Sequence, residues 1–435
     1  MSEASARARV MVEKLRAHGY QALLVGGCVR DLLLGREPKD YDVATDARPE
    51  EVRTLFPQGE PVGAHFGVVL VDGVEVATFR SDGAYLDGRR PEQVVYEKSA
   101  EADAKRRDFT INGLFLDPVT GEVFDFVGGR EDLQAGRIRA IGDPDERFRE
   151  DHLRLLRAIR FAARFEYEIE SATWSAMARQ AARIVGIAAE RVRDELDRIL
   201  REGGARRGFE LLEESGLLVQ VLPEVSAMKG VAQPPEHHPE GDVWTHTRLM
   251  LEGLRQPTRT LAWGVLLHDV AKPPTFRVAE RIRFDGHVEL GARMAVEILT
   301  RLRFGHEDIE QVRALVAHHL GWMNIRQMRP SRLKRFLRLE RFEEHLELHR
   351  LDCWSSHRRL ENYEFARAQL EALAPEELRP PRLVTGRDLI AAGLTPGPAF
   401  TSILTAVEDA QLEGVVRTRE EALELALRMR PPVSA

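Results

Sequence analysis

Two short patterns near the N-terminus have residue types that could bind a nucleotide and a metal ion. Gly26 and Gly27 lie between an apolar stretch, predicted to be a strand, and a predicted helix that carries Arg30. Paired glycines let backbone amides approach a phosphate, and a helix N-terminus attracts negative charge. Asp40 and Asp42 enter the next predicted strand, where residues two apart share a face. Such a pair could bind Mg²⁺ together with substrate phosphates and so support phosphoryl transfer. Taken alone, each pattern is also compatible with an ordinary turn.

Glu75 is a candidate third carboxylate for the same site. It lies in residues 67–80, which have the pattern of a β-hairpin with Asp72 and Gly73 at its turn. A glutamate on this predicted hairpin could join the two aspartates, although a plain surface glutamate is the alternative.

Histidine is concentrated in the second half of the chain, where eleven of the fourteen lie between His237 and His357. His268 and Asp269 follow an apolar run, and burying this adjacent pair is costly unless both side chains bind something. A metal ion is the simplest explanation. Imidazole and carboxylate ligands suit Fe, Mn, Ni, Co or Zn, and the sequence does not discriminate among them.

These candidate residues fall in two structurally different parts of the chain. Strand and helix patterns alternate up to about residue 145, which predicts a compact domain of mixed sheet and helices. After about residue 146 the apolar residues recur with helical spacing and strand signals vanish. Proline-containing breaks divide this helical part. We therefore expect four domains, at residues 1–145, 146–233, 234–372 and 373–435.

Composition excludes several classes of protein. Hydrophobic residues make up 43% of the 435 residues and charged residues 31%, a balance typical of a globular chain. The longest apolar runs are far shorter than the roughly 20 residues of a membrane span. We expect no secretory signal, because the first residues lack an apolar core. Cys28 and Cys353 are the only cysteines, so a disulfide framework is excluded and a reducing cytoplasm is expected. A net charge of −7 excludes a uniformly basic coat for nucleic acid.

The glycines and carboxylates near the N-terminus lie in a segment that resembles a known protein family. The segment LLVGGCVRDLLLGREPKDYDVATDARPEEVRTLF resembles the catalytic head of class II template-independent RNA nucleotidyltransferases. These are the CCA-adding enzymes and bacterial poly(A) polymerases of the DNA polymerase β superfamily. Five later segments match in order, namely VEVATFR, RRDFTINGLFLD, DFVGGREDLQAGRIRAIG, REDHLRLLRAIRFAARF and AAERVRDEL. The resemblance implies an α+β fold, with a polymerase-β-type head of mixed sheet and helices and an all-α remainder.

The resemblance also implies roles for individual residues. Asp40 and Asp42 would bind Mg²⁺, and Glu75 would help to activate the 3′-OH of the RNA. Ala77 departs mildly from the family, which more often has Thr there. The residues implied to bind the nucleotide are Gly26, Gly27, Arg30, Arg107, Asp108, Asn112, Asp151, Arg154, Arg157 and Arg160.

Four of these residues recur every third position on one predicted helix, which keeps neighbours near one face. An aspartate and an arginine can match the acceptors and donors on the Watson–Crick edge of a base. In the resembling family such a pair selects CTP or ATP, which implies this role for Asp151 and Arg154. Arg157 and Arg160 would then hold triphosphate oxygens. A salt-bridged helix face is the alternative.

The histidines resemble those of the HD phosphohydrolase superfamily in the order H…HD…H…HH…D. The resemblance implies an HD domain followed by a helical tail, with Lys272 near the metals to hold a phosphate. The implied core ligands are His246, His268, Asp269 and Asp352, which His287 and His318 or His319 would extend toward two metals. Linker positions are expected for His237 and His238, and solvated or capping positions for His306, His345, His349 and His357.

A basic stretch between residues 325 and 338 contains no acidic residue. An RNA-contacting helix and a solvated helix surface are about equally compatible with it. Its basic residues are Arg326, Arg329, Arg332, Lys334, Arg335 and Arg338.

Together, the resemblances imply a cytoplasmic enzyme, with no membrane partner, that adds C, C and A to tRNA 3′ ends from CTP and ATP. Its HD site would remove phosphates or cyclic phosphates near that end. A poly(A) polymerase is one alternative, although such enzymes usually have a strongly basic tail. Others are an enzyme that adds only A beside a CC-adding partner, and an HD hydrolase with a relic head. The loop YLDGRRP argues against CC-only addition, and intact Asp40, Asp42, Asp151 and Arg154 argue against a relic.

Overall fold

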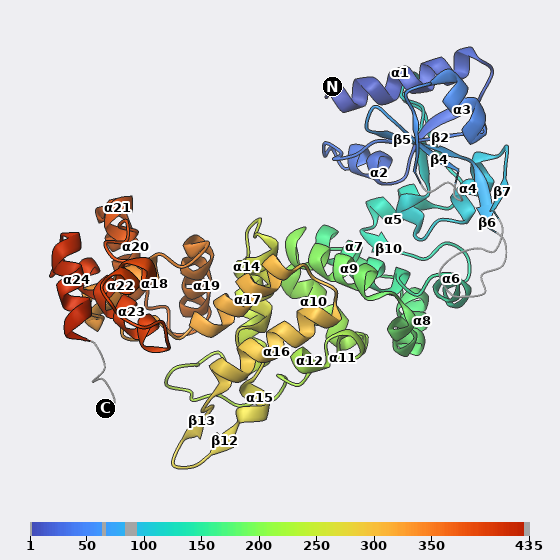
Figure 1. Cartoon of the computed structure of the whole chain (residues 1–435). Coiled ribbons are helices and arrows are strands. Elements are labelled where there is room, and N and C mark those ends of the chain that lie inside the picture. The colour runs from blue at the N-terminus through green and yellow to red at the C-terminus, as the bar shows by residue number, and fades with distance from the viewer. Residues whose placement is uncertain (1, 63–66, 83–93, 430–435) are drawn as a thin grey trace. The chain divides into compact units, whose positions relative to one another are not determined.

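The computed structural model describes residues 2–62, 67–82 and 94–429 (Figure 1). The chain forms two compact units, one of Met1–Ala227 with Arg301–Arg303 and the other of Met228–Thr300 with Phe304–Ala435. The expected head and neck thus share one unit, and the expected HD domain and tail share the other. No helix among the described residues is long and apolar enough to cross a membrane. The YLDGRRP loop lies outside the described residues.

The first unit is built on a seven-stranded mixed sheet in the order β3-β4-β5-β2-β1-β8-β9. Its strands are β1 Ala22–Val25, β2 Asp42–Thr45, β3 Glu60–Val62, β4 Val68–Val71, β5 Val74–Thr78, β8 Leu114–Leu116 and β9 Val123–Asp125. Every residue of β1 is buried, which fits its central place and its unbroken apolar sequence. Helices α1 (Glu3–Ala17), α2 (Gly27–Leu33) and α3 (Pro49–Leu55) pack against these strands. The predicted mixed sheet is confirmed.

The hairpin of β4 and β5 places Glu75 beside Asp42. Asp72 and Gly73 both have positive φ, as the tight turn between right-twisted strands requires, so the predicted turn is confirmed. β5 then pairs with β2 in parallel, and Glu75 is directly opposite Asp42. Side chains opposite each other in register project from the same face of a sheet, so these two carboxylates share a face.

Helices follow the sheet in the first unit. They are α4 Ala100–Lys105, α5 Gly129–Gln134, α6 Pro144–Glu150, α7 Arg154–Phe165, α8 Ser171–Gln180, α9 Ala189–Arg201, α10 Ala205–Glu214, α11 Leu218–Val221 and α12 Pro223–Ser226, with 3-10 turns η1 Thr110–Asn112 and η2 Ala181–Gly186. Strand pairing does not stop near residue 146, because β11 (Glu168–Ile169) pairs in parallel with β10 (Arg137–Ile138). β6 (Arg80–Asp82) and β7 (Val94–Tyr96) form a separate pair. Helix α7 is buried along almost its whole length, so α9 and α10 enclose it.

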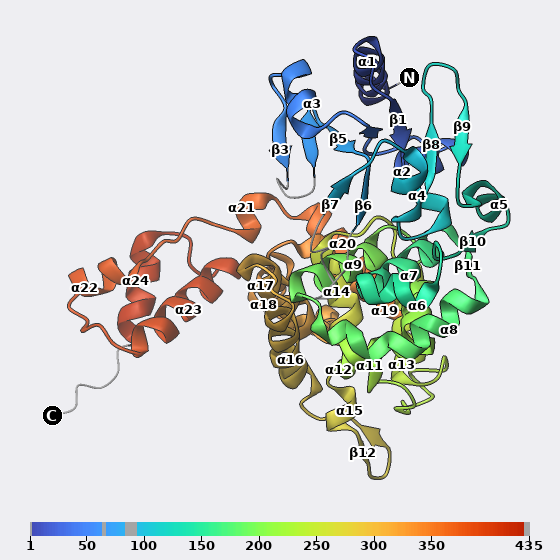
Figure 2. The ribbon, with the colours of Figure 1, turned by 90° about the vertical axis from the view of Figure 1, so that its right-hand side faces the viewer.

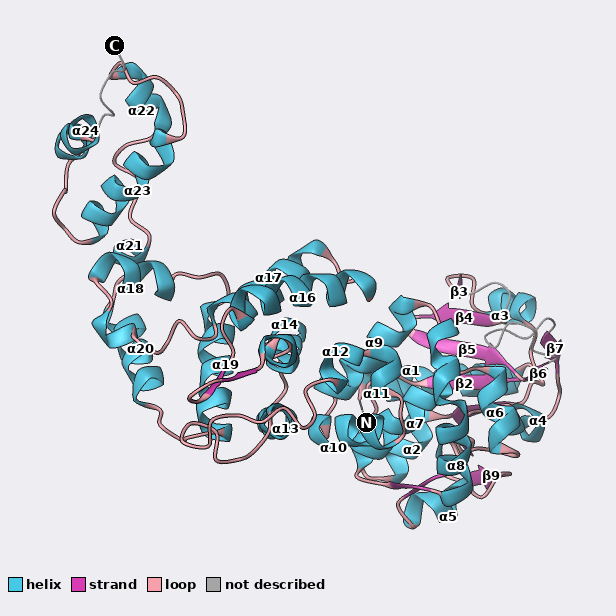
Figure 3. Ribbon diagram, turned by 90° about the horizontal axis from the view of Figure 1, so that it is seen from below, coloured by secondary structure: helices cyan, strands magenta, loops and turns pink. Residues whose placement is uncertain are grey.

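The second unit is almost entirely helical (Figure 3). Its helices are α13 Val243–Gly253, α14 Arg259–Leu267, α15 Lys272–Thr275, α16 His287–Arg301, α17 His306–His318, α18 Pro330–Leu337, α19 Phe342–Ser355, α20 Glu361–Ala372, α21 Pro375–Leu378, α22 Gly386–Ala391, α23 Ala399–Leu412 and α24 Arg419–Arg428, with the 3-10 turn η3 Ile325–Gln327. Helix α14 is apolar all round and packs against α13, α17 and α19. A hairpin of β12 (Arg277–Val278) and β13 (Ile282–Arg283) extends from these helices (Figure 2).

The basic stretch at 325–338 mostly holds the tail in place. Helix α18 packs against α23, and Arg329 lies 2.8 Å from Asp409. Arg335 and Arg338 both pair with Glu408, and the Lys334 ammonium donates to the carbonyl of Leu412. These four cations are therefore not freely solvated, because their partners lie within the chain, and contact of the stretch with RNA stays a prediction.

Gly204 allows α10 to approach α7 closely. It has φ +70°, and a Cβ there would lie 2.2 Å from the carbonyl oxygen of Ala163 on α7. We predict that Gly204→Ala lowers the free energy of unfolding by at least about 2 kcal/mol, from backbone strain and overpacking together. Urea unfolding followed by circular dichroism measures this change. Gly186→Ala is the control, because its Cβ would meet no atom within 4 Å. Equal effects of the two substitutions would contradict this account of the contact.

Candidate active sites

The three predicted carboxylates lie around the start of β2 and the middle of β5. Asp42 is half-buried, whereas Asp40 and Glu75 are exposed. Burial, and then the charges of Glu75 and Asp40, raise the pKa of Asp42 to about 6, and Arg107 opposes this shift. The carboxylates therefore repel one another, which a bound cation would relieve. Mg²⁺ prefers oxygen ligands and is usually held by one or two carboxylates plus substrate phosphates, which fits Asp42 with Glu75 opposite it in register.

The turn after β1 allows the chain to pass close to Arg107. Gly26 has φ +77°, and a Cβ there would lie 3.0 Å from Nη1 of Arg107. The next turn of α2 carries Arg30, whose guanidinium donates to Oδ1 of Asp31 and, at 2.6 Å, to Oδ1 of Asn112. Arg30 also lies over the ring of Phe165, 4.6 Å from its centroid. This arginine is therefore fixed within the domain interior.

One cavity of about 460 Å³ in the first unit is lined by every residue that the resemblance implies for nucleotide binding. Asp42 also lines it. The lining residues are Gly26, Gly27, Arg30, Asp42, Arg106, Arg107, Asp108, Asn112, Asp151, Leu153, Arg154, Arg157, Arg160, Phe161, Arg164 and Arg191. Eight of these sixteen are arginines, so the cavity suits a ligand with several negative charges.

Acidic partners hold the arginines of α7. Arg157 lies 2.6 Å from Asp108, and Arg160 lies 2.6 Å from Glu195 of α9. Burial raises the pKa of Asp108, but the charge of Arg157 outweighs it and keeps the carboxyl well below its usual range. Arg160 is 5% exposed, so its pair with Glu195 is part of the interior. Some N–H donors of Arg157 and Arg160 are therefore already paired with Asp108 and Glu195, and a bound triphosphate would contact the remaining ones.

Asp151 and Arg154 are held from opposite sides. Asp151 follows α6, accepts from the backbone N–H of Leu153, and is paired with Arg191 at 2.7 Å. The guanidinium of Arg154 donates to Glu150 and to the carbonyl of Arg147. Both side chains of the implied base-selecting pair are thus oriented before any ligand binds.

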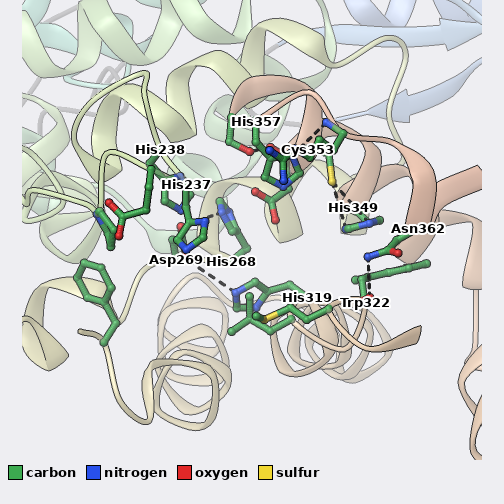
Figure 4. A pocket seen from close by; sticks show the side chains of 18 of the residues that line it. His237, His238, His268, Asp269, His319, Trp322, His349, Cys353, His357 and Asn362 are labelled. Atoms are coloured by element: carbon green, nitrogen blue, oxygen red, sulfur yellow. Dashed lines mark hydrogen bonds and ion pairs between the residues drawn. The ribbon is translucent and has the colours of Figure 1, made fainter. Parts of the chain in front are cut away.

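The second unit brings six predicted metal ligands together in two adjacent triads. One triad is His246, His268 and Asp352, and the other is Asp269, His287 and His319, with the ligand atoms of each within 4.8 Å of one another. These ligands come from five segments of the sequence. Helices α13, α16 and α19 carry His246, His287 and Asp352. His268 and Asp269 follow α14, and His319 follows α17. The site is therefore assembled by packing around the buried α14, which contacts α13, α17 and α19. Figure 4 shows His268, Asp269 and His319 of the two triads.

Each imidazole of these triads presents its Nε2 to the cluster. The Nδ1 atoms of three of them face carbonyl oxygens three residues earlier, at 2.7–2.9 Å, namely His268 to Val265, His287 to Phe284 and His319 to Val316. Nδ1 of His246 instead meets Glu240 at 2.7 Å. All four Nε2 atoms, and Oδ1 of Asp269, are buried. Nε2 of His246 lies 3.2 Å from Asp352 and Nε2 of His268 lies 3.1 Å from Asp269, so the cluster atoms face one another. This convergent set fits a bound metal, for which Nε2 is the ligand when Nδ1–H is held.

Electrostatics differ among the ligands of the cluster. Burial opposes protonation of His246, but Asp352 and Glu240 outweigh it and raise its pKa to about 9. Burial lowers the pKa of His319 to about 4, which keeps this imidazole neutral at pH 7. Burial also opposes ionisation of Asp269, but the charges of His268 and Lys272 hold its pKa well below the ordinary value. The Lys272 ammonium lies 2.7 Å from Asp269 and donates to Gln233. Lys272 therefore sits beside the cluster, where the resemblance implies a phosphate.

The structure does not bring His318 into either triad. Its ring is 5.9 Å from that of His345, away from the cluster, so the choice between His318 and His319 falls on His319. His345 and His349 are 2% and 7% exposed, so the expectation of solvated or capping positions is wrong for both. His238 is not a plain linker residue, because Glu240 holds its Nδ1 at 2.9 Å and its ring lies 5.0 Å from that of His246.

Comparison with known proteins places these two sites in known domains. Residues 22–139 match the model of the poly(A) polymerase head domain, and residues 166–229 that of the probable RNA- and SrmB-binding site of polymerase A. Residues 241–351 match the HD domain. One part of the chain is therefore similar to the poly(A) polymerase head domain, and another part to the HD domain. The HD match spans five of the six clustered ligands, and Asp352 follows its last residue.

The curated relatives of this head-and-HD chain include CCA-adding enzymes. That of Lactococcus lactis subsp. lactis is 42% identical over 240 residues, which cover 53% of this chain and 60% of that protein. That of Bacillus pumilus is 38% identical over 272 residues, covering 62% and 64%. The chain thus spans less than two thirds of the length of either relative.

Solved structures extend the similarity of fold along the chain. The crystal structure of the Bacillus stearothermophilus CCA-adding enzyme in complex with CTP has a TM-score of 0.74 and 27% identity, and the match covers 98% of each chain. The Thermotoga maritima CCA-adding enzyme complexed with tRNA shares the fold at 20% identity, with a TM-score of 0.58 over 97% of this chain and 94% of that one.

Three arginines of the head and neck were missed as individual site residues. Arg106, Arg164 and Arg191 line the arginine-rich cavity of the first unit. Arg191 lies within the matching segment AAERVRDEL, which could have drawn attention to it, but its contact with Asp151 spans forty residues. Glu240 of the HD domain was also missed, because no spacing pattern connects it to His246.

The two adjacent histidines after α17 provide a direct test of the metal cluster. We predict that His319→Ala lowers the affinity for a divalent transition metal by at least about tenfold, because one Nε2 ligand is lost. Metal content after dialysis, measured by inductively coupled plasma mass spectrometry, checks this. His318→Ala is the matched control and is expected to retain the metal. Equal loss in both variants would show that the cluster is assigned wrongly.

Proposed function

We propose that this chain is a CCA-adding nucleotidyltransferase, which adds C, C and A to tRNA 3′ ends from CTP and ATP without a nucleic-acid template. The observation that carries the proposal is the arginine-rich cavity beside Asp42, which gathers ten implied nucleotide-binding residues in one place. The similarity to CCA-adding enzymes in both sequence and fold supports it. We infer a cytoplasmic setting, in keeping with two buried, free cysteines.

In this proposal the 3′ oxygen of the RNA attacks the α-phosphorus of the nucleotide, and pyrophosphate leaves. Asp40 and Asp42 hold Mg²⁺, which would supply charge for the attacking and leaving oxygens. Glu75, in register with Asp42, offers a carboxylate that can accept the proton of the 3′-OH as the oxygen attacks. Arg107, whose charge acts on Asp42, faces the phosphates of the nucleotide.

Asp151 and Arg154 select the base. Arg191 and the backbone of Leu153 fix the Asp151 carboxylate, which can accept from an exocyclic amino group. CTP and ATP both carry such an amino group, whereas UTP lacks one and GTP presents it elsewhere. Glu150 sets the plane of the Arg154 guanidinium. A pair that is oriented in advance discriminates without a template strand.

The HD domain is proposed to be a phosphohydrolase acting on phosphates or cyclic phosphates near the RNA end. A divalent metal from among Fe, Mn, Ni, Co and Zn, held by the two triads, would acidify water for attack on phosphorus. Water adds to phosphorus, the bond from phosphorus to the ribose oxygen breaks, and that oxygen takes a proton. Lys272 is placed beside Asp269 to hold a phosphate oxygen.

Extension of three tRNA transcripts tests the proposed addition. The transcripts end before CCA, after C and after CC, and each is incubated with CTP, ATP or both. We predict two C residues followed by one A, and then a stop. Runs of A from ATP alone, regardless of the tRNA body, would make the chain a poly(A) polymerase. A single A added only to the CC-ending transcript would mean that another enzyme supplies the cytidines.

Asp42→Asn is predicted to slow this extension by about a thousandfold, because a charged ligand of the catalytic cation is lost. The control is Asp72→Asn at the turn of the same hairpin, where asparagine tolerates the positive φ. The rate of single-nucleotide addition is measured for each variant. Unimpaired extension by the Asp42 variant would refute the assigned metal site.

Asp151→Ala is predicted to weaken discrimination between CTP and UTP by about tenfold or more, since one base-edge contact disappears. Single-turnover incorporation of each nucleotide on the transcript ending before CCA measures the ratio. An unchanged ratio at reduced rate would mean that Asp151 supports the fold of α7 and does not read the base.

A further inference from the structure

The cavity of the HD domain extends beyond the metal cluster. It has a volume of about 650 Å³, and the cluster residues His268, Asp269 and His319 line one side of it (Figure 4). The other side is lined by Trp322, His349 and Asn362, which the same view shows apart from the cluster. A cavity of this size accommodates more than a single phosphate group, so the second side has room for a further part of the ligand.

Two arginines on this second side have no partner. Arg326 lies on η3 and Arg359 in the segment between α19 and α20; both are exposed and both line the cavity. Among the described residues, neither guanidinium has a hydrogen bond or an ion pair. Glu361 at the start of α20 also lines the cavity, as do Glu236, Asp269 and Asp352.

The neighbouring basic residues show that these two arginines are unusual. Three arginines of the same basic stretch, at 329, 335 and 338, all pair with acidic residues of α23. Arg332 of α18 is exposed and does not line the cavity. The cations left without a protein partner inside the cavity are therefore available to an anion.

Apolar side chains accompany them. Leu320 and Met323 line the same cavity and are 39% and 71% exposed. The ring of Trp322 is buried and stacked on His349 at 4.4 Å. Exposed apolar side chains beside guanidinium groups suit contact with a nucleobase and its backbone phosphate.

We propose that Arg326 and Arg359 form a second phosphate subsite, which binds the phosphodiester of an RNA strand whose terminal phosphate lies at the metal cluster. The ligand is thus the end of a polynucleotide, with the preceding nucleotide against Leu320 and Met323. This inference rests on the proposed phosphohydrolase activity at the RNA end and adds a second binding subsite to that site. The chemistry recognised is a phosphate anion, which a strand or free inorganic phosphate could provide.

Binding to the metal-free, full-length protein tests the subsite without the hydrolytic reaction. The probes are a dinucleotide with a 3′-terminal phosphate and the corresponding nucleoside 3′-monophosphate, titrated by calorimetry. We expect wild type to bind the dinucleotide at least about tenfold more tightly, because two charge-assisted contacts are added. The double variant Arg326→Ala and Arg359→Ala should bind both probes with the same affinity. Arg332→Ala is the matched control and should keep the difference.

Several outcomes would overturn the proposal. Equal affinity of the wild type for both probes would show that the second subsite does not exist. If inorganic phosphate, added at the concentration of the dinucleotide, abolished the difference in affinity between the two probes, the subsite would be one for a free anion. The single variants Arg326→Gln and Arg359→Gln, with circular dichroism and melting curves, exclude loss of folding as the cause. A separate assay of monophosphate hydrolysis with Mn²⁺ tests the phosphohydrolase, so its failure is distinguishable from failure of the subsite.

Discussion

The cost of burying charge organises both sites of this chain. An ionised side chain removed from water must be paired, and breaking such a pair costs about 3–5 kcal/mol because the remaining charge is uncompensated. Helix α7 places Arg154 and Arg160 in the interior, and the acids that neutralise them come from elsewhere in the fold. Asp108 follows α4 and pairs with Arg157, while Glu195 lies on α9. Head and neck are therefore joined through the same side chains that line the arginine-rich cavity.

The buried polar groups of the HD cluster also need partners, but here the chain supplies only some of them. There the Nδ1 atoms of the histidines are satisfied by the chain, whereas the Nε2 atoms of His287 and His319 and one oxygen of Asp269 have no hydrogen bond among the described residues. In α7 the protein supplies the counter-charges itself, and the arginines are held without a ligand. In the HD domain the protein leaves the inner atoms unsatisfied, which is tolerable only if a cation completes them. The two sites thus differ in whether the missing partner is a side chain or a metal.

Local patterns in the sequence predict the turns and strands of this arrangement, but they do not predict contacts between distant residues. The tight turn at Asp72-Gly73 follows from adjacent residues and is confirmed, and with it the placement of Glu75 on the strand beside Asp42. Contacts between distant residues, such as Asp151 with Arg191, leave no such trace. Successive helical residues point about 100° apart, so His318 and His319 face different neighbours although they are adjacent. Burial of His345 and His349 depends on how α19 packs, which spacing alone does not reveal.

The basic stretch shows why charge patterns need a structure to be interpreted. In sequence, Arg326 and Arg329 are equivalent members of one positive run, and an RNA-contacting helix would use both alike. In the fold, Arg329 meets Asp409 of the tail, eighty residues away, whereas Arg326 lies on η3 before α18 begins and enters the HD cavity. Helix α18 turns its cations toward an acidic helix because that pairing joins the tail to the HD domain. A cation is available to a ligand only where the fold offers no acid in reach, and the two ends of this run differ in that respect.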